Sequence, residues 1–156
     1  MPLLDPFNEY KFNRRYLPHY QIAERYYFIT SHCKKGITLT PPERDIIHQA
    51  ILFLDGKKYD LTTSVVMDDH IHIVLKPLQT DSENYYSISQ IMHSIKSFSA
   101  QKCGRKLWQH ESYDRVVRNG EDFLEYLQYI RNNPYKRELV QADEDYKWYY
   151  LVNVTE

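Results

Sequence analysis

The chain has 156 residues, of which 42% are hydrophobic and 26% charged, and its formal net charge at pH 7 is −1. This length and composition indicate a single domain with a packed core. No apolar run approaches the roughly 20 residues that a membrane-spanning helix needs, and the near-neutral charge argues against DNA binding by simple electrostatic attraction.

The glycines and cysteines exclude several common chemistries. Only four glycines occur and each is isolated, so the sequence has neither a P-loop nor a dinucleotide-binding fingerprint, and we expect no dependence on ATP or NAD. The two cysteines, Cys33 and Cys103, lack the spacing of a zinc site or a disulfide framework. The first fifteen residues have no apolar segment of the secretory type. We therefore expect a reducing, cytoplasmic environment.

Charge is distributed unevenly along the chain. Basic side chains outnumber acidic ones in residues 93–118 and again in 131–137, whereas residues 138–156 are mainly acidic. A basic middle followed by an acidic tail is compatible with one nucleic-acid-binding face and a solvated or self-masking tail. The alternative is local fluctuation of charge in a neutral protein.

The N-terminal part predicts a strand and a helix. Residues 1–20 hold three of the seven prolines and indicate an irregular leader. Residues 24–33 are rich in aromatic and β-branched side chains, which is typical of a strand. Thr40, two prolines and Glu43 form a capping-box pattern, and the apolar spacing behind it predicts an amphipathic helix ending at residues 55–56.

The middle of the chain predicts a hairpin and a second helix. Residues 59–67 and 70–77 favour strands, joined by a tight turn at Asp68 and Asp69. Ser87 is placed to cap the following helix. The apolar stripe expected on that helix comprises Ile88, Ile91, Met92, Ile95 and Phe98.

The C-terminal part predicts an extended segment at residues 108–117 and a last helix. This helix opens at residues 119–122 and is expected to run to Asn133, because Pro134 disfavours its continuation. The order of elements predicts an α+β, ferredoxin-like two-layer sandwich: a mainly antiparallel sheet with helices on one face and a C-terminal helix. We expect one domain over residues 1–156, with the leader and an acidic tail at 140–156.

Two histidines flank one isoleucine in the strand 70–77. Alternation places His70 and His72 on the same face, with Cα atoms about 7 Å apart, while the intervening Ile71 points to the other face. Two imidazoles at this spacing can converge on one divalent cation. The alternative is a pair of polar residues on an exposed sheet face.

The last helix carries a tyrosine away from its apolar stripe. At about 100° per residue, Tyr129 lies well off the stripe centred on Phe123 and Leu127, and Asn133 follows one turn later on the side of Tyr129. Tyr126 flanks the stripe and is expected to pack. Tyr129 is therefore a candidate for chemistry, although with fifteen tyrosines in the chain it could also pack against a loop.

Together these residues are the parts of a metal-assisted phosphodiester transesterase. A cation held by His70, His72 and a side-chain oxygen would act as a Lewis acid on a phosphate, and the phenol of Tyr129 would attack phosphorus. A free phenol, with a pKa of about 10, is a poor nucleophile at neutral pH, so the positive site must also favour phenolate. Two imidazoles and an amide oxygen suit Mn²⁺ or Mg²⁺.

The same residues lie in stretches that resemble a known family. Residues 65–77 (VVMDDHIHIVLKP) resemble the His-hydrophobic-His (HUH) strand of the single-tyrosine transposases, and residues 129–139 (YIRNNPYKREL) resemble their nucleophile helix. Residues 14–33 and 107–119 are similar, more specifically, to REP-associated tyrosine transposases. The similarity spans roughly residues 14–140. The sequence departs from the family after Pro134, where small residues and glycine are more usual, in its pI of about 6.7, which is low for the group, and in the acidic, aromatic residues 143–152.

The resemblance implies a role for each motif residue. His70 and His72 would be metal ligands, Asn133 would replace a third ligand that is often glutamine, and Tyr129 would be the nucleophile. The implied activity is that of a transposase: a single-stranded DNA endonuclease and strand transferase, acting on hairpin DNA through a 5′-phosphotyrosine, with Mg²⁺ or Mn²⁺ as cofactor. Such a protein would associate with the nucleoid, with no membrane partner.

Several basic residues are candidates for contacts with DNA. They are Arg14, Arg15 and His19 in the leader, His93, Lys96 and Lys102 on the helix 87–103, and Arg115 and Arg118 beyond it. A solvated helix face or an irregular terminus would explain them equally well.

Two other functions and the oligomeric state stay open. A domesticated module could hold hairpin DNA or RNA without cutting it, and a metallohydrolase could use a metal-bound water in place of Tyr129. The protein could be a monomer, or a homodimer in which the tyrosine helix serves the partner's histidines.

Overall fold

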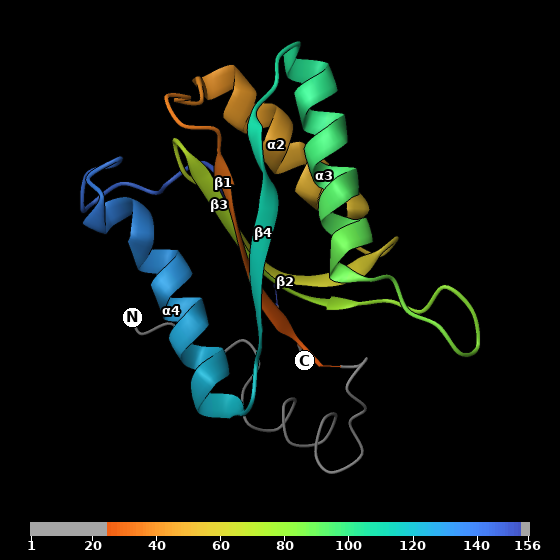
Figure 1. The fold of residues 1–156 in the computed structure, drawn as a ribbon. Helices are drawn as coiled ribbons and strands as arrows, with labels where there is room; N and C mark the ends of the chain where they lie inside the picture. Colours follow the sequence, from red (N-terminus) through yellow and green to blue (C-terminus); the bar gives the residue numbers. More distant parts are fainter. Residues whose placement is uncertain (1–24, 154–156) are drawn as a thin grey trace.

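A computed structural model describes residues 25–153, which form a five-stranded antiparallel sheet with three helices (Figure 1). The strands stand in the order β4-β1-β3-β2-β5. Their bounds are Tyr27–Cys33 for β1, Tyr59–Val66 for β2, His70–Pro77 for β3, Trp108–Val116 for β4 and Tyr149–Leu151 for β5. The helices are α2 at Pro41–Leu54, α3 at Ile88–Cys103 and α4 at Gly120–Lys136.

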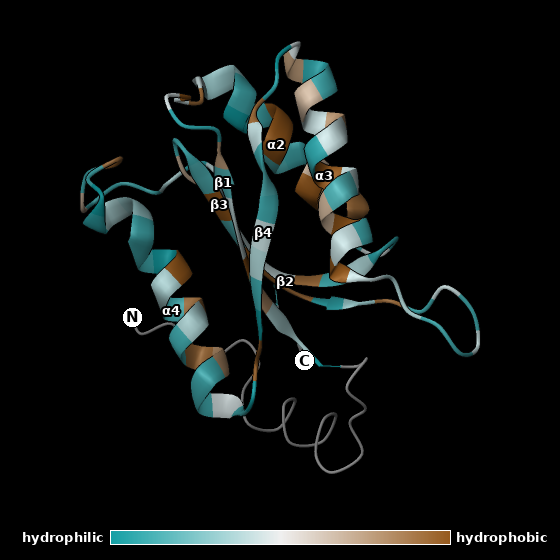
Figure 2. Ribbon diagram, viewed as in Figure 1, coloured by the Kyte–Doolittle hydropathy of each residue, from teal (hydrophilic) through white to brown (hydrophobic). Residues whose placement is uncertain are grey.

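Helices cover both faces of the sheet. Helices α2 and α3 lie together on one face, and α4 packs on the opposite face (Figure 1). The predicted α+β architecture is confirmed, and α4 adds a layer of its own to it. Along α3 and α4 hydrophobic and hydrophilic residues alternate, as expected for helices buried on one side (Figure 2).

Each face of the sheet has its own hydrophobic core. In the first, Ile71, Ile73 and Leu75 of β3 are fully buried beneath α2 and α3. In the second, Val74 of β3 packs with Phe123 and other apolar residues of α4. Because β3 is central and buried on both faces, its alternation decides which side chains face α4.

Helix starts follow the predicted caps. The side chains of Thr40 and Ser87 each accept a hydrogen bond from the backbone N–H of the third helical residue. The side chain of that residue accepts a bond from the backbone N–H of the cap, so both helices begin with a complete capping box. The prediction that Phe98 belongs to the buried stripe of α3 was wrong. Phe98 is 46% exposed, because Ser99 occupies the buried position at the end of that helix.

The predicted acidic tail is in part a structural element. Strand β5 pairs with β2, and the buried Tyr146 donates a hydrogen bond from its hydroxyl to the carbonyl of Val66 at 2.6 Å. The indole N–H of Trp148 donates to the carboxylate of Asp45 on α2 at 2.7 Å. Strand pairing and the aromatic residues of this segment therefore attach it to the domain as far as Val152, whose N–H donates to the carbonyl of Thr62 at 2.8 Å.

Helix α4 continues one turn beyond the predicted end at Asn133. Pro134 lies inside the helix and is buried; its fixed φ is helical, and only one helical hydrogen bond is lost with its missing N–H. The helix then closes in a Schellman motif, in which Leu139 N–H bonds the carbonyl of Pro134 at 2.8 Å and Glu138 N–H bonds that of Tyr135 at 3.0 Å. Glu138 takes the left-handed position, with φ of 59°.

None of the helices within residues 25–153 has the length and apolar character needed to cross a membrane.

The left-handed backbone of Glu138 predicts that Glu138→Gly stabilises the protein. Glycine adopts positive φ without steric cost, so the free energy of unfolding should rise by about 0.5–1 kcal/mol in a urea titration. Gln128→Gly, at an exposed position inside the same helix, should lower it by about 1 kcal/mol. Equal losses in both variants would contradict this account of the helix end.

Candidate active site

His70 and His72 lie side by side on the face of β3 that α4 covers. Their ring centroids are 4.7 Å apart, and the residues are only 6% and 4% exposed, so they are not the exposed polar pair of the alternative interpretation. Strand alternation sends Ile71 and Ile73 into the opposite core. The same packing that buries β3 therefore holds the two imidazoles on a rigid support.

Each imidazole is oriented through its Nδ1 atom. His70 Nδ1 lies 2.7 Å from a carboxylate oxygen of Asp69, and His72 Nδ1 lies 2.8 Å from the hydroxyl of Thr30 on β1. With Nδ1 protonated in both rings, each Nε2 has a free lone pair. Nε2 of His72 is buried and has no hydrogen-bonding partner.

The surroundings keep both imidazoles neutral. Burial, reinforced by the neighbouring His70, lowers the pKa of His72 to about 3. Burial also lowers the pKa of His70, although its hydrogen bond with Asp69 acts in the opposite direction. Neutral imidazoles bind metal ions, so the pair is in its metal-binding protonation state at neutral pH.

Tyr129 extends from α4 over this pair. Its ring centroid lies 5.2 Å from that of His72, with the rings at 70°, and the residue is 48% exposed. Tyr126, one turn earlier, stacks on Phe28 with centroids 4.3 Å apart. The two tyrosines of one helix thus have different surroundings: Tyr126 packs against the sheet, and Tyr129 borders open space beside an imidazole.

Asn133 shares an open cleft of about 1230 Å³ with His70, His72 and Tyr129. Asn133 is 7% exposed and lies on α4 one turn after Tyr129. The structure therefore brings together all four residues that the sequence nominates for catalysis and metal binding.

The donor set of the cleft fits a divalent cation. Within residues 25–153, no group of three His, Cys, Asp or Glu side chains is placed to hold a metal ion. The unpartnered Nε2 of His72 lies in the same cleft as His70 and Asn133, and imidazole nitrogens and amide oxygens are ligand types that divalent cations accept.

A salt link connects α4 to the histidine strand. A guanidinium nitrogen of Arg137, at the end of α4, lies 3.7 Å from the Asp69 oxygen that bonds His70, and 3.6 Å from Asp68. The hairpin turn thus contacts both the last turn of α4 and the first imidazole.

Sequence reasoning missed His32 as a residue of the cleft. It stands directly opposite His70 in the β1–β3 pairing, with ring centroids 5.3 Å apart. The alternation of side chains within β1 was the one signal in the sequence, and it could only assign His32 to one face of that strand. The residue opposite it is set by the register between strands distant in sequence, which tertiary pairing decides. Tyr113 of β4 is 57% exposed and lines the same cleft.

The predicted DNA-binding residues fall into different environments. Arg14, Arg15 and His19 lie outside the described residues. Arg115 is exposed and lines the cleft, whereas the guanidinium of Arg118 bonds Asp122 at 2.8 Å.

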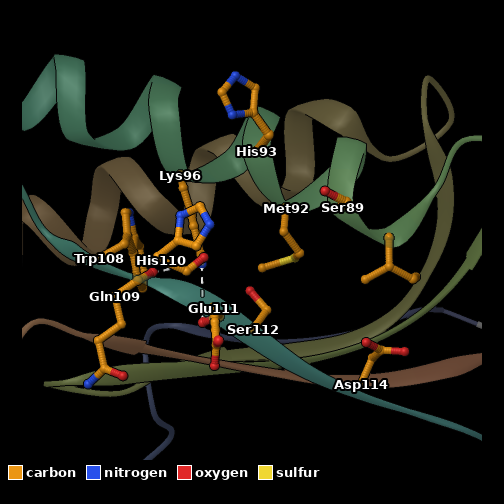
Figure 3. Close-up of a pocket in the computed structure, with 11 residues that line it drawn as sticks. Ser89, Met92, His93, Lys96, Trp108, Gln109, His110, Glu111, Ser112 and Asp114 are labelled. Atoms are coloured by element: carbon orange, nitrogen blue, oxygen red, sulfur yellow. Dashed lines mark hydrogen bonds between the residues drawn. The ribbon is translucent and has the colours of Figure 1, made fainter.

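The three candidates on α3 are not near the paired histidines. His93 and Lys102 are exposed on that helix, which covers the other face of the sheet. The ammonium of Lys96 is occupied by the main chain, donating to the carbonyls of Gln109 at 2.9 Å and His110 at 3.2 Å (Figure 3). The prediction of a phosphate contact is therefore weakest for Lys96.

The chain is similar in sequence and in fold to proteins of one named group. Over 114 residues, which cover 72% of this chain and 67% of the relative, the chain is 24% identical to the REP-associated tyrosine transposase of Escherichia coli (strain K12). The predicted resemblance is confirmed. A structure of a REP-associated tyrosine transposase bound to a REP hairpin matches with a TM-score of 0.65 and 21% identity, covering 88% of this chain and 91% of that one. No family model matches the chain.

The Asp69–His70 contact predicts a measurable effect on metal affinity. The negative charge of Asp69 orients His70 and makes its Nε2 a stronger metal ligand. Asp69→Asn removes this charge, so the affinity for Mn²⁺ should fall about tenfold or more. Isothermal titration of the DNA-free protein measures this directly. Asp60→Asn, at an exposed position of β2, is the matched control. An unchanged affinity in Asp69→Asn would show that the carboxylate does not support a metal ligand.

Proposed function

We propose that this protein is a metal-dependent tyrosine transposase that cuts and rejoins single-stranded DNA beside a hairpin. The observation that carries the proposal is the position of Tyr129, half-exposed in an open cleft with its ring 5.2 Å from His72. The similarity to REP-associated tyrosine transposases, one of which is described bound to a REP hairpin, supports hairpin DNA as the partner.

The chemistry is a phosphodiester transesterification. The phenol oxygen of Tyr129 attacks phosphorus, and the bond from phosphorus to the 3′-oxygen of the preceding nucleotide breaks. The phenol loses its proton and the departing 3′-oxygen gains one, so the products are a 5′-phosphotyrosine and a free 3′-hydroxyl. A second DNA hydroxyl can reverse the step without ATP, because the ester retains the bond energy.

A divalent cation, Mg²⁺ or Mn²⁺, held by His70, His72 and Asn133 would supply Lewis-acid polarisation of the phosphate. The protein itself positions the reactants. The buried strand β3 fixes the imidazoles, and α4 presents Tyr129 to the same space. Arg115 and Lys136 line the cleft and can contact phosphates on either side of the cleavage point, whereas Arg137 in the same lining is paired with Asp68 and Asp69.

All four proposed site residues meet within one chain. Tyr129 contacts His72 of its own chain, and Arg137 at the end of the same helix contacts Asp69 in the turn before β3. We therefore propose that a monomer holds a complete active site. A trans arrangement would have to separate these contacts.

Tyr129→Phe tests the nucleophile. With a labelled hairpin oligonucleotide and Mn²⁺, the original protein should form a covalent adduct that survives denaturing electrophoresis, and Tyr129→Phe should form none. Its fold should be retained because the hydroxyl lies on a half-exposed ring. Tyr126→Phe, on the same helix, should keep the adduct.

Other outcomes of that experiment support the rival functions. Cleavage that persists in Tyr129→Phe but is lost in His70→Ala or His72→Ala would indicate a metallohydrolase. Binding by the original protein with no adduct on any of a varied set of hairpins would indicate a non-cleaving DNA- or RNA-binding module.

Arg115 and Arg118 should differ in DNA binding. Arg115 borders the cleft, whereas Arg118 is engaged by Asp122. In filter-binding assays across a salt series, Arg115→Ala should weaken hairpin binding and lower the slope of log affinity against log salt by about 1. Arg118→Ala should have the smaller effect. Equal effects would place the DNA path away from the cleft.

A further inference from the structure

The hydroxyl of Tyr129 is not held by a hydrogen bond. Within residues 25–153 no such bond joins it to another residue, and the side chain is half-exposed beside the open cleft. A tyrosine in such a place can turn about its χ1 and χ2 bonds into several staggered positions, only some of which point the phenol at the paired histidines. The contacts of its ring therefore decide where the phenol points.

Two other rings contact the ring of Tyr129, and both meet it edge-on. The centroid of His72 lies 5.2 Å away with the rings at 70°, and the centroid of Phe28 lies 6.0 Å away with the rings at 77°. These separations and angles are typical of edge-to-face aromatic pairs. Two neighbours of this kind restrict the tilt of the tyrosine ring more than one neighbour would.

The side chain of Phe28 is itself well supported. It lies on β1, an inner strand that pairs with both β3 and β4. Its ring is nearly parallel to that of Tyr126, at 8° with centroids 4.3 Å apart, and to that of His72, at 18° with centroids 5.4 Å apart. Phe28 thus links the packed tyrosine of α4 to the imidazole beside which Tyr129 lies.

The imidazole of His72 does not depend on Phe28 for its orientation. Its Nδ1 lies 2.8 Å from the hydroxyl of Thr30, and the residue is buried in a strand that is covered on both faces. Tyr129 has no comparable hydrogen bond among the described residues. Loss of the Phe28 ring would therefore leave the imidazole in place and release the phenol.

We propose that Phe28, supported by Tyr126, is a positioning residue that holds the ring of Tyr129 in the orientation needed for attack on phosphorus. The inference rests on the proposed transposase function and names the group that orders its nucleophile. The effect of Phe28 falls on the chemical step, because a nucleophile held near its attack position has less freedom to lose before reaction. Affinity for the metal ion and for the hairpin depends on other groups, namely the imidazoles and the basic side chains.

The first measurement uses the protein without DNA. A single 3-fluorotyrosine, introduced at position 129 by amber suppression, reports the surroundings of this ring through its ¹⁹F NMR signal. Phe28→Leu should move the resonance towards its position in the urea-unfolded protein, because the neighbouring aromatic ring is lost. Val74→Ala is the matched control: Val74 lies opposite Phe28 in β3 and is buried in the same core, and its truncation leaves every ring in place. The resonance should stay where it is in this control.

The second measurement is single-turnover cleavage of a labelled hairpin with Mn²⁺. Phe28→Leu should lower the rate of adduct formation about tenfold or more, while the dissociation constants for Mn²⁺ and for the hairpin stay within about twofold of the original values. Tyr126→Leu, which removes the ring behind Phe28, should lower the rate by a smaller factor. Phe28→Tyr keeps the ring and should restore most of the rate. Val74→Ala should lower the free energy of unfolding in a urea titration and yet keep nearly the full rate.

A Phe28→Leu protein that forms the adduct at the original rate would overturn the positioning role and leave the transposase function standing. So would a fluorine resonance that does not move. Equal rate losses in Phe28→Leu and Val74→Ala would also overturn the role, because loss of packing alone would then explain the result. Failure of the unsubstituted protein to form an adduct on any hairpin would overturn the transposase function, and the role of Phe28 with it.

Discussion

The candidate site depends on one constraint: β3 is buried on both faces, so its side chains cannot exchange sides. A shift of one residue in its pairing would expose Ile71 and Ile73 to the α4 face and push His70 and His72 into the larger core. The pairing register that buries the isoleucines in the first core therefore also sets the face on which the two histidines lie. The free energy of hydrophobic burial is what positions the two polar residues.

A second constraint joins the helix to the strand. Helix α4 packs on the sheet through Phe123, Leu127 and Ile130, and its last turn reaches the β2–β3 turn through Arg137 and Asp69. Apolar contacts set the distance of the helix from the sheet, and the charged contact lies where the two elements converge. Both act on the backbone that carries Tyr129, so the same contacts hold this part of α4 beside the imidazoles.

Local sequence chemistry was sufficient for most elements and insufficient where pairing between distant segments decided the outcome. Capping boxes at Thr40 and Ser87 located two helix starts, because a cap depends on neighbours within four residues. Strand β5 was missed, since three aromatic and aliphatic residues in an acidic segment form a strand only against the edge of β2. The prediction that Pro134 ends the last helix was wrong, because the free energy gained by burying α4 outweighs the loss of one hydrogen bond.

By itself the sequence determined the fold class, the shared face of the two histidines and the separation of Tyr129 from the apolar stripe, since all three follow from the periods of strands and helices. Their roles stay predictions. Only the tertiary structure decided that Tyr129 lies beside His72 of the same chain and that His32 lies in the cleft next to His70. It also decided that the ammonium of Lys96 donates to a main-chain carbonyl of β4. These depend on register and on packing between elements far apart in sequence, which no local pattern encodes.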